Sequence, residues 1–337
     1  MAATDRFTGD FNLDVVGIGN AIVDVLVQTD DAFLASQSLE KGGMALIDEE
    51  RAESLYKASG PGQETSGGSA ANTLVGIAEL GGRAGFIGRV RDDQLGRIFS
   101  HDIQAVGARF ETPAATQGAS TARCLIYVTP DAERTMCTFL GASTQLEPDD
   151  LDLSMVRDTK VLYLEGYLWD SPAAKRAFIA AAEACKASGG QVALSLSDGF
   201  CVDRHRESFL ELVNGHVDVL FANEVEIKAL YQTDDFETAL ENVKGCCAVT
   251  AITRGADGSV VLSGDQRWTI GIVGLGALVD TTGAGDLYAG GFLHAYTQGE
   301  SLQRCGELGS LCAGQIVTQL GARSQQPLNE LAAQHFN

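Results

Sequence analysis

Basic residues are scarce in this sequence, with 24 lysines and arginines against 45 aspartates and glutamates, so the formal net charge is −21. So acidic a surface repels phosphate backbones and anionic lipids, which argues against a protein that binds nucleic acid or a membrane surface. A small anionic ligand stays compatible, because a local nest of backbone N–H groups can bind phosphate. Long apolar runs and a basic, apolar leader are also missing, so we expect a cytoplasmic protein.

Sequence motifs of several enzyme classes are absent. No G-x-x-x-x-G-K-[ST], H-E-x-x-H or G-x-S-x-G sequence occurs. Residues 17–22 begin like a dinucleotide-binding fingerprint, but isoleucine stands where the third glycine is required. The eight cysteines form no C-x-x-C pair, and the five histidines are scattered. These absences disfavour a P-loop, a metalloprotease and a dinucleotide-dependent oxidoreductase, and they indicate reduced, structural thiols.

Short apolar runs alternate with helical segments in the second half of the chain. Each run is too short for a buried helix, and the runs begin about every 30 residues with amphipathic segments between most of them. They occupy residues 161–164, 192–196, 217–221 and 248–252. Strands separated by helices predict a parallel sheet with right-handed crossovers, and therefore an α/β fold: a three-layer α/β/α sandwich with a mostly parallel central sheet.

The first half of the chain fits this alternation only in part. Residues 69–80 read as a helix with Ser69 as its N-cap, but residues 22–48 are β-prone and residues 120–140 alternate like a hairpin. We therefore expect a small antiparallel β lid formed by residues 22–48 and 110–142. The remaining residues, 1–21, 49–109 and 143–337, would form a large nucleotide-binding domain. A plainer alternative is that the interrupting strands extend the main sheet.

The most informative segment is V-D-T-T-G-A-G-D at residues 279–286, which leads into a helical stretch. Glycines at the entry to a helix let a ligand approach the backbone, and the first N–H groups attract an anion. Asp286 falls in the first helical turn, where a carboxylate can accept a proton from a hydroxyl while the N–H groups stabilise a transferring phosphoryl group. The alternative is an aspartate that merely favours its own helix dipole.

Two further segments carry polar groups suited to ligands. Gly67-Gly68 precedes the helix that contains Asn72, whose amide would face Asn20 or Asp24 if the first strand is adjacent; such groups suit sugar hydroxyls. The plainer interpretation is a Gly-Gly turn with a helix cap.

Asn223 and Glu226 follow a strand and share one helix face, so they could hold the water shell of Mg²⁺. The plainer interpretation is a helix cap with a solvated glutamate. Residues 253–258, T-R-G-A-D-G, also follow a strand and offer donors suited to phosphate, although they could form a simple turn.

These motifs together resemble the ribokinase/PfkB family of carbohydrate and nucleoside kinases. The resemblance spans nearly the whole chain in the right order, and the segment at 280–286 is highly specific. G-N-A-I-V-D at 19–24, G-G-S-A-A-N at 67–72 and D-A-E-R-T-M at 131–136 are similar to the adenosine kinase branch. The resemblance implies a ribokinase-like fold and ATP- and Mg²⁺-dependent phosphorylation of a primary hydroxyl on a nucleoside or sugar.

The resemblance also implies residue roles. Asp286 would be the catalytic base, beside an anion hole for the γ-phosphate formed by Gly283, Ala284 and Gly285. The acceptor would be held by Asn20, Asp24, Gly68 and Asn72, and by Arg134 reaching from the lid.

The remaining roles concern the nucleotide and metals. Asn223 and Glu226 would organise Mg²⁺ through water, with Thr253 and Gly255 near the ATP phosphates. Asp280 and Thr282 match positions that line a monovalent-cation (K⁺) site in many members of the family.

The identity of the acceptor is the main choice that the sequence leaves open. An apolar pocket for a base would require Ile22, Leu46 and Tyr167 to converge. Arg91 stands where the family has glycine, so the loop around it is expected to differ in shape. The alternatives are a ribokinase- or fructokinase-type sugar kinase and a non-catalytic regulator that binds the same ligand. The chain could act as a monomer or as a homodimer through its lid strands.

Overall fold

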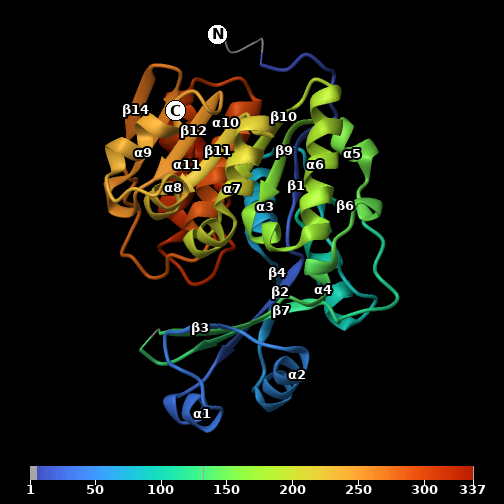
Figure 1. The fold of residues 1–337 in the computed structure, drawn as a ribbon. Helices are drawn as coiled ribbons and strands as arrows, with labels where there is room; N and C mark the ends of the chain where they lie inside the picture. Colours follow the sequence, from blue (N-terminus) through green and yellow to red (C-terminus); the bar gives the residue numbers. More distant parts are fainter. Residues whose placement is uncertain (1–5, 132, 337) are drawn as a thin grey trace.

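The computed structural model describes residues 6–131 and 133–336, whose strands form two sheets (Figure 1). The larger sheet has nine strands in the order β14-β13-β12-β11-β10-β9-β1-β5-β6. Strands from β12 to β6 pair in parallel, whereas β13 and β14 are antiparallel additions at one edge. The strands are β1 (Leu13–Ile18), β5 (Ala84–Ile87), β6 (Arg109–Phe110), β9 (Thr159–Glu165), β10 (Gln191–Ser195), β11 (Val219–Asn223), β12 (Val249–Thr253), β13 (Ser259–Ser263) and β14 (Gln266–Ile270).

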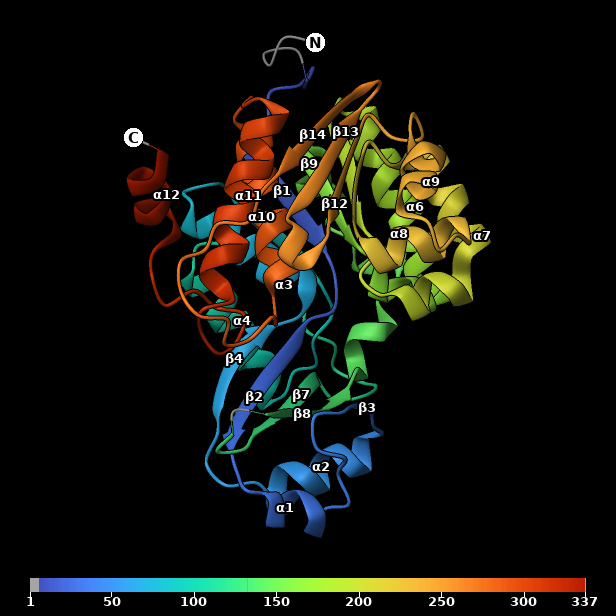
Figure 2. The ribbon, with the colours of Figure 1, turned by 90° about the vertical axis from the view of Figure 1, so that its left-hand side faces the viewer.

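Helices cover both faces of this sheet, which confirms the predicted three-layer sandwich (Figure 2). One face carries α3 (Ser69–Glu79), α4 (Gln94–Ala105), α10 (Ala284–Thr297) and α11 (Leu302–Ile316), with α12 (Leu328–Phe336) beside them. The other carries α5 (Leu153–Arg157), α6 (Pro172–Ala187), α7 (Gly199–His216), α8 (Glu224–Tyr231) and α9 (Phe236–Val243). Each layer has its own buried apolar cluster because the central strands are apolar on both faces. No helix in the described part has the length and apolar character needed to cross a bilayer.

The second sheet is the lid, with the strand order β3-β8-β7-β2-β4. The expectation of an antiparallel lid is wrong in part, because β2 pairs with β7, and β3 with β8, in parallel. Only pairs joined by a tight turn must be antiparallel, and the partners in these parallel pairs are far apart in sequence. The lid elements are β2 (Ile22–Gln28), β3 (Met44–Leu46), β4 (Gln63–Gly67), β7 (Ala122–Val128), β8 (Arg134–Phe139), α1 (Asp31–Ser36) and α2 (Glu49–Ala58). Strand β4 and helix α2 therefore belong with the lid sheet, whereas the predicted division placed residues 49–67 in the large domain.

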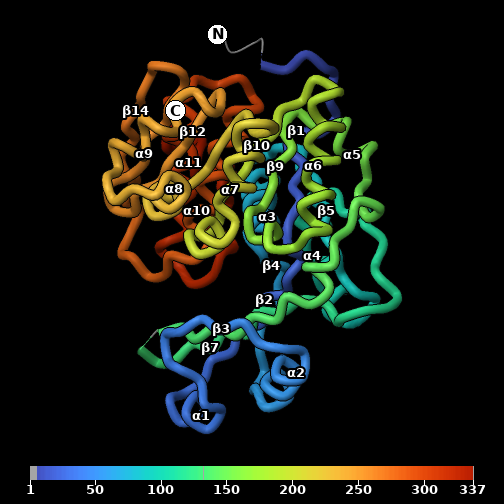
Figure 3. Tube along the Cα trace, in the orientation of Figure 1, coloured from blue at the N-terminus to red at the C-terminus, as the bar shows by residue number. Residues whose placement is uncertain are grey.

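The lid faces the C-terminal edge of the main sheet. Only residues 19–21 separate β1 from β2, so the chain leaves the C-terminal end of β1 directly into the lid (Figure 3). Strand β4 then returns directly into α3, which packs against β1. Because parallel strands all end at the same edge, the ends of β9, β10, β11 and β12 face the lid as well. Ligands of open α/β sheets bind at this edge.

Candidate active site

A cleft of about 700 Å³ lies between the lid sheet and the C-terminal edge of the main sheet. Most of the predicted site residues line it, although they come from widely separated parts of the chain. They are Asn20, Asp24, Gly68, Asn72, Asn223, Glu226, Thr253, Thr282, Gly283, Gly285 and Asp286. The other predicted residues, Arg134, Gly255, Asp280 and Ala284, are not part of the cleft wall.

Helix α10 begins at the cleft with its N-terminal amides uncapped by any described side chain. Its N-cap is Gly283 in the left-handed region, with φ +78°, and a Cβ there would stand 2.7 Å from the Cβ of Ala322. Gly285 has open space where a side chain would be. The Ala284 N–H already donates to the Thr281 carbonyl at 3.1 Å, so the N–H groups after it are better placed to receive an anion.

Asp286 lies in the first turn of α10 and is held by two residues of α3. Its Oδ1 accepts from the Ser69 hydroxyl at 2.6 Å, and its Oδ2 accepts from the Asn72 amide at 2.9 Å. Burial raises the pKa of Asp286, and these hydrogen bonds partly offset the rise. A carboxylate with a raised pKa next to uncapped helix amides suits a general base. The prediction that Ser69 caps α3 is wrong, because Gly68 occupies the N-cap position.

The two glycines before α3 are required by the residues they touch. A Cβ on Gly67 would collide with the carboxyl group of Asp24, and one on Gly68 would collide with the carbonyl oxygen of Asn20. Gly68 also has φ +95°, which disfavours any other residue. The Gly-Gly step therefore lets α3 begin directly against the two predicted acceptor-binding residues.

Glu165, at the end of β9, organises the floor of the cleft and was not predicted from the sequence. Its carboxylate accepts from the Asn20 side-chain amide at 2.6 Å and from the Ala70 N–H at 2.8 Å. The side chain is 1% exposed, and burial raises its pKa to about 7. Asn20 in turn accepts from the Ser143 hydroxyl at 2.8 Å. The only sequence signal for Glu165 is an acidic residue that ends an otherwise apolar strand.

Asp24 faces the cleft from β2, near a half-buried arginine, Arg323, that was not predicted from the sequence. Burial raises the pKa of Asp24 to about 6, although the charges of Arg323 and Arg134 oppose the shift. Arg323 donates to the Ser66 hydroxyl at 2.9 Å, and Ser66 donates to Asp102. No pattern around Arg323 in the sequence distinguishes it from a surface arginine.

Asn223 and Glu226 form a reciprocal cap at the start of α8. The Asn223 side chain accepts from the Glu226 N–H at 2.8 Å, and Glu226 accepts from the Asn223 N–H at 2.9 Å and from its amide at 2.6 Å. Glu226 is 6% exposed, and burial raises its pKa to about 7. A buried carboxylate that lines the cleft fits Mg²⁺ held through water. Within the described ranges, no cluster of three or more metal-ligating side chains occurs, so direct coordination by several residues is not indicated.

Arg134 links the lid to the segment before α10. Its guanidinium pairs with Asp280 and donates to the Thr282 hydroxyl at 2.9 Å. Asp280 also accepts from the N–H groups of Thr282, at 3.0 Å, and Gly321, at 2.9 Å. The carboxylate predicted to line a K⁺ site is thus already engaged by an internal cation, and this arrangement does not fit a monovalent cation held by Asp280.

The remaining predicted positions lie at the margins of the cleft. Thr253 lines the cleft at the end of β12, whereas Gly255 begins the short helix η5 (Gly255–Asp257) with φ +56°. Arg91 forms an isolated bridge with Ala115 and donates to the Gly118 carbonyl at 2.5 Å, outside the cleft wall.

Exposed apolar side chains also line the cleft. Ile22, Leu46 and Tyr167 all contribute to the wall, which confirms their expected convergence. They are joined by Met44, which is 62% exposed, and by Phe200, which is 77% exposed. So many exposed apolar groups around one concavity indicate a binding surface for an apolar or aromatic ligand.

The fold and the site together define a phosphotransferase that acts on an alcohol. Comparison with known proteins bears this out, because residues 44–329 match the model of the pfkB family carbohydrate kinases. The chain belongs to this family, and it is a kinase that phosphorylates a nucleoside or a sugar.

Two solved structures and a relative matched by sequence support the assignment. The crystal structure of adenosine kinase from Sinorhizobium meliloti is 50% identical, with a TM-score of 0.88, over 96% of this chain and 99% of that chain. A probable sugar kinase from Rhizobium etli is 48% identical, with a TM-score of 0.89, over 97% and 99%. The adenosine kinase of Saccharomyces cerevisiae is 26% identical over 91% of this chain and 95% of its own length.

Proposed function

We propose that this kinase transfers the γ-phosphoryl group of ATP to the primary hydroxyl of a purine nucleoside such as adenosine. The observation that carries the proposal is the position of Asp286: its carboxylate faces the same cleft as Asp24 and Asn72, next to the uncapped amides of α10. Base, anion site and acceptor-binding groups are thus within one cavity.

The residues of the cleft account for each part of the reaction. Asn20, Asp24 and Asn72 hold the ribose hydroxyls. Asp286 takes the proton of the acceptor's primary hydroxyl while the hydroxyl oxygen bonds to the γ-phosphorus. The bond between the γ-phosphorus and the β–γ bridging oxygen breaks, which releases ADP. The amides of α10 stabilise the negative charge of the phosphoryl group during transfer.

Glu226 and Asn223 would hold Mg²⁺ through water near Thr253 and the phosphates. When bound, the metal neutralises phosphate charge during transfer. This function matters here because the cleft is strongly acidic: Asp24, Glu165, Glu226 and Asp286 all line it, and they repel an uncompensated polyphosphate.

The apolar wall favours a nucleoside over a bare sugar. Tyr167, Phe200, Met44 and Leu46 are exposed in the absence of a ligand, and a sugar has no apolar face large enough to cover them. A heterocyclic base does, and stacking on aromatic rings stabilises it. The S. meliloti and S. cerevisiae relatives named above as adenosine kinases agree with this choice. A sugar kinase is the second candidate, on the likeness to the probable sugar kinase of R. etli.

An acceptor panel tests the proposal. ADP release is measured with Mg-ATP and adenosine, inosine, cytidine, ribose or fructose, and phosphorus NMR locates the new ester. We expect adenosine to give the highest kcat/KM, with the phosphate on the primary hydroxyl. Highest activity with ribose or fructose would favour the sugar kinase, and no ADP release with any acceptor would favour a non-catalytic binding protein.

A further inference from the structure

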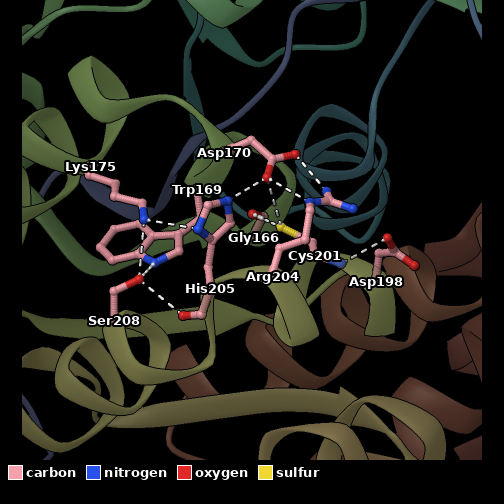
Figure 4. A network of polar contacts seen from close by, with 9 residues as sticks. All are labelled: Gly166, Trp169, Asp170, Lys175, Asp198, Cys201, Arg204, His205 and Ser208. Atoms are coloured by element: carbon pink, nitrogen blue, oxygen red, sulfur yellow. Dashed lines mark hydrogen bonds and ion pairs between the residues drawn. The ribbon is translucent and has the colours of Figure 1, made fainter.

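A polar network joins the short helix η4 (Gly166–Asp170) to the first turns of α7 (Figure 4). Asp170 is its centre. One carboxylate oxygen, Oδ1, is 2.6 Å from Nε2 of His205, and the other, Oδ2, accepts from Nη2 of Arg204 at 2.8 Å. The Arg204 Nε also approaches Oδ1, at 3.3 Å. Asp170 and Arg204 both line the wall of the cleft.

Lys175 of α6 determines how His205 takes part. Its ammonium is 3.3 Å from Nδ1 of His205 and donates to the Ser208 hydroxyl at 3.1 Å, above the ring of Trp169. An ammonium group can only donate, so Nδ1 must be the accepting nitrogen. The hydrogen on Nε2 then donates to Asp170. The chain of donors runs from Lys175 through His205 to Asp170.

The backbone at His205 gives this network a role in orienting the first segment of α7. His205 has φ −126° and ψ 23°, so α7 is interrupted there and its first turn is a separate segment. A kink of this kind weakens the helical hydrogen-bond ladder between the first segment and the rest of α7. Side-chain contacts therefore also set the orientation of the first segment. They are those of Arg204 and His205 with Asp170, a Cys201 thiol that reaches the Gly166 carbonyl at 3.6 Å, and an ion pair between Asp203 and Arg206 across the interruption.

Both segments joined by Asp170 present an aromatic side chain to the cleft. Tyr167 lies in η4 and is 47% exposed, and Phe200 lies in the first turn of α7. The contacts of Asp170 are themselves half-exposed, with the side chains of Asp170 and Arg204 49% and 53% accessible. Ion pairs this exposed contribute little to the stability of a fold, about 0–1 kcal/mol. A role in overall stability therefore does not explain the arrangement.

We propose that Asp170 is a positioning residue that sets the spacing between Tyr167 and Phe200, and so the slot that receives the heterocycle of the acceptor. The inference rests on the proposed function, because it takes a nucleoside as the acceptor. Partial burial works against ionisation of Asp170, but the hydrogen bonds from Arg204 and His205 prevail and lower its pKa. The carboxylate thus stays charged at neutral pH and holds both partners.

Steady-state kinetics and calorimetry on the full-length protein test the inference with three variants. Asp170→Ala removes both contacts, Arg204→Gln removes one, and Glu237→Gln is the matched control. Glu237 pairs with Arg267 at 2.6 Å in a similarly exposed arginine–carboxylate contact, outside the cleft wall and away from α7. The acceptors are adenosine and methyl β-D-ribofuranoside, which carries the same sugar without a base.

For Asp170→Ala we expect the KM and the calorimetric Kd for adenosine to rise about tenfold, because the contacts of Tyr167 and Phe200 with the base are weakened. We expect kcat to change less than about twofold. Binding of the methyl riboside should not change. Arg204→Gln should give a smaller rise, and Glu237→Gln none. Asp170→Glu, which keeps the charge, should restore part of the adenosine affinity.

Three results would overturn the inference: equal losses for adenosine and the methyl riboside, unchanged adenosine affinity in Asp170→Ala, or a wild-type protein that binds no nucleoside. A wild-type protein that binds adenosine but releases no ADP contradicts the proposed function instead. In that case the calorimetric comparison of the variants still decides the role of Asp170.

Discussion

The carboxylates of the cleft are held at an energetic cost to the fold. Glu165 and Glu226 are buried and Asp24 is half-buried in a chain of net charge −21, and loss of solvation raises the pKa of each to between about 6 and 7. Their retention is understandable if they serve the ligand, because hydroxyl groups donate hydrogen bonds to carboxylates and hydrated Mg²⁺ supplies positive charge near them.

Replacing Asp24 by asparagine should therefore stabilise the protein without ligand. The pKa of Asp24 is about 6 in the fold and 3.8 normally, and a shift of this size corresponds to about 3 kcal/mol. A raised pKa penalises the fold fully above pH 6, and the penalty disappears as the pH falls towards 3.8. In urea unfolding, Asp24→Asn should have a higher free energy of unfolding than the wild type at pH 8 and nearly the same value at pH 4. The variant should also lose affinity for the acceptor.

Asp14 is a control for this prediction, because its pKa is shifted in the opposite direction to that of Asp24. Burial opposes its ionisation, but Arg83 and Lys160 prevail and lower its pKa to about 2. A lowered pKa stabilises the fold above pH 3.8, and this contribution is lost as the pH falls through about 2. Asp14→Asn should thus destabilise the protein at pH 8 by about 2 kcal/mol. If both variants shift stability in the same direction, the electrostatic explanation is wrong.

At the scale of elements, helix α3 connects the two halves of the site. Its N-terminus packs against Asn20 through Gly68, and its Ser69 and Asn72 hold Asp286 on α10. Residues that begin one helix thereby position the base on another. The geometry of this junction depends on the Gly68 backbone more than on any side chain.

A pair of glycine substitutions on α3 tests this dependence. Gly68 and Gly81 have similar backbone angles, φ +95° and +88°, but a Cβ meets the Asn20 carbonyl at Gly68 and nothing within 4 Å at Gly81. Gly81→Ala should cost only backbone strain, about 1 kcal/mol, and leave the kinetics unchanged. Gly68→Ala should cost more and raise the acceptor KM more than about tenfold, as measured by thermal unfolding and steady-state assays. Equal effects of the two substitutions would contradict this explanation.

The elements of the large unit could be predicted from the sequence because their signals are local. The apolar runs at β9 to β12, and the glycine-led starts of α3 and α10, lie within a few residues of the structure they specify. The lid could not be predicted as well. Strands β2 and β7 pair in parallel across almost a hundred residues of chain, and no local pattern distinguishes that pairing from a hairpin.

In the molecule as a whole, Arg134 joins the lid directly to the segment that leads into α10. It pairs with Asp280 and Thr282, three residues or fewer from the helix N-cap, so the position of the lid is coupled to the anion site. We propose that the two parts act as domains and that this contact accompanies a closed lid over the cleft. A closed lid excludes water, which would otherwise accept the phosphoryl group.

Arg134→Gln should therefore uncouple ATP hydrolysis from transfer. Lys41 is a suitable control, because it also pairs with two aspartates, Asp31 and Asp131, but within the lid. The ratio of ADP formed to acceptor phosphorylated should be near one for the wild type and for Lys41→Gln, and well above one for Arg134→Gln, with kcat lowered at least about tenfold. A ratio of one in all three proteins would contradict the role of Arg134.

The site could be predicted where chemistry and motif coincide, as at Asp286, Asn72 and Asn223. It could not be predicted where tertiary contact alone creates the role. Glu165 contacts the site only because β9 ends beneath Asn20, and Arg323 only because the chain after α11 reaches Ser66. The roles of Asp170 and Arg204 likewise arise from the meeting of η4 with α7. These contacts join segments that are distant in the sequence, so no local pattern predicts them.

The most direct measurement is the rate of phosphoryl transfer by Asp286→Asn in a rapid-quench single turnover with saturating Mg-ATP and adenosine. Asparagine keeps the size of the side chain and its contact with Ser69, but it cannot take the hydroxyl proton. We expect the transfer rate to fall about a thousandfold, with the Kd for ATP within about twofold of the wild type. A transfer rate within tenfold of the wild type would show that Asp286 is not the base.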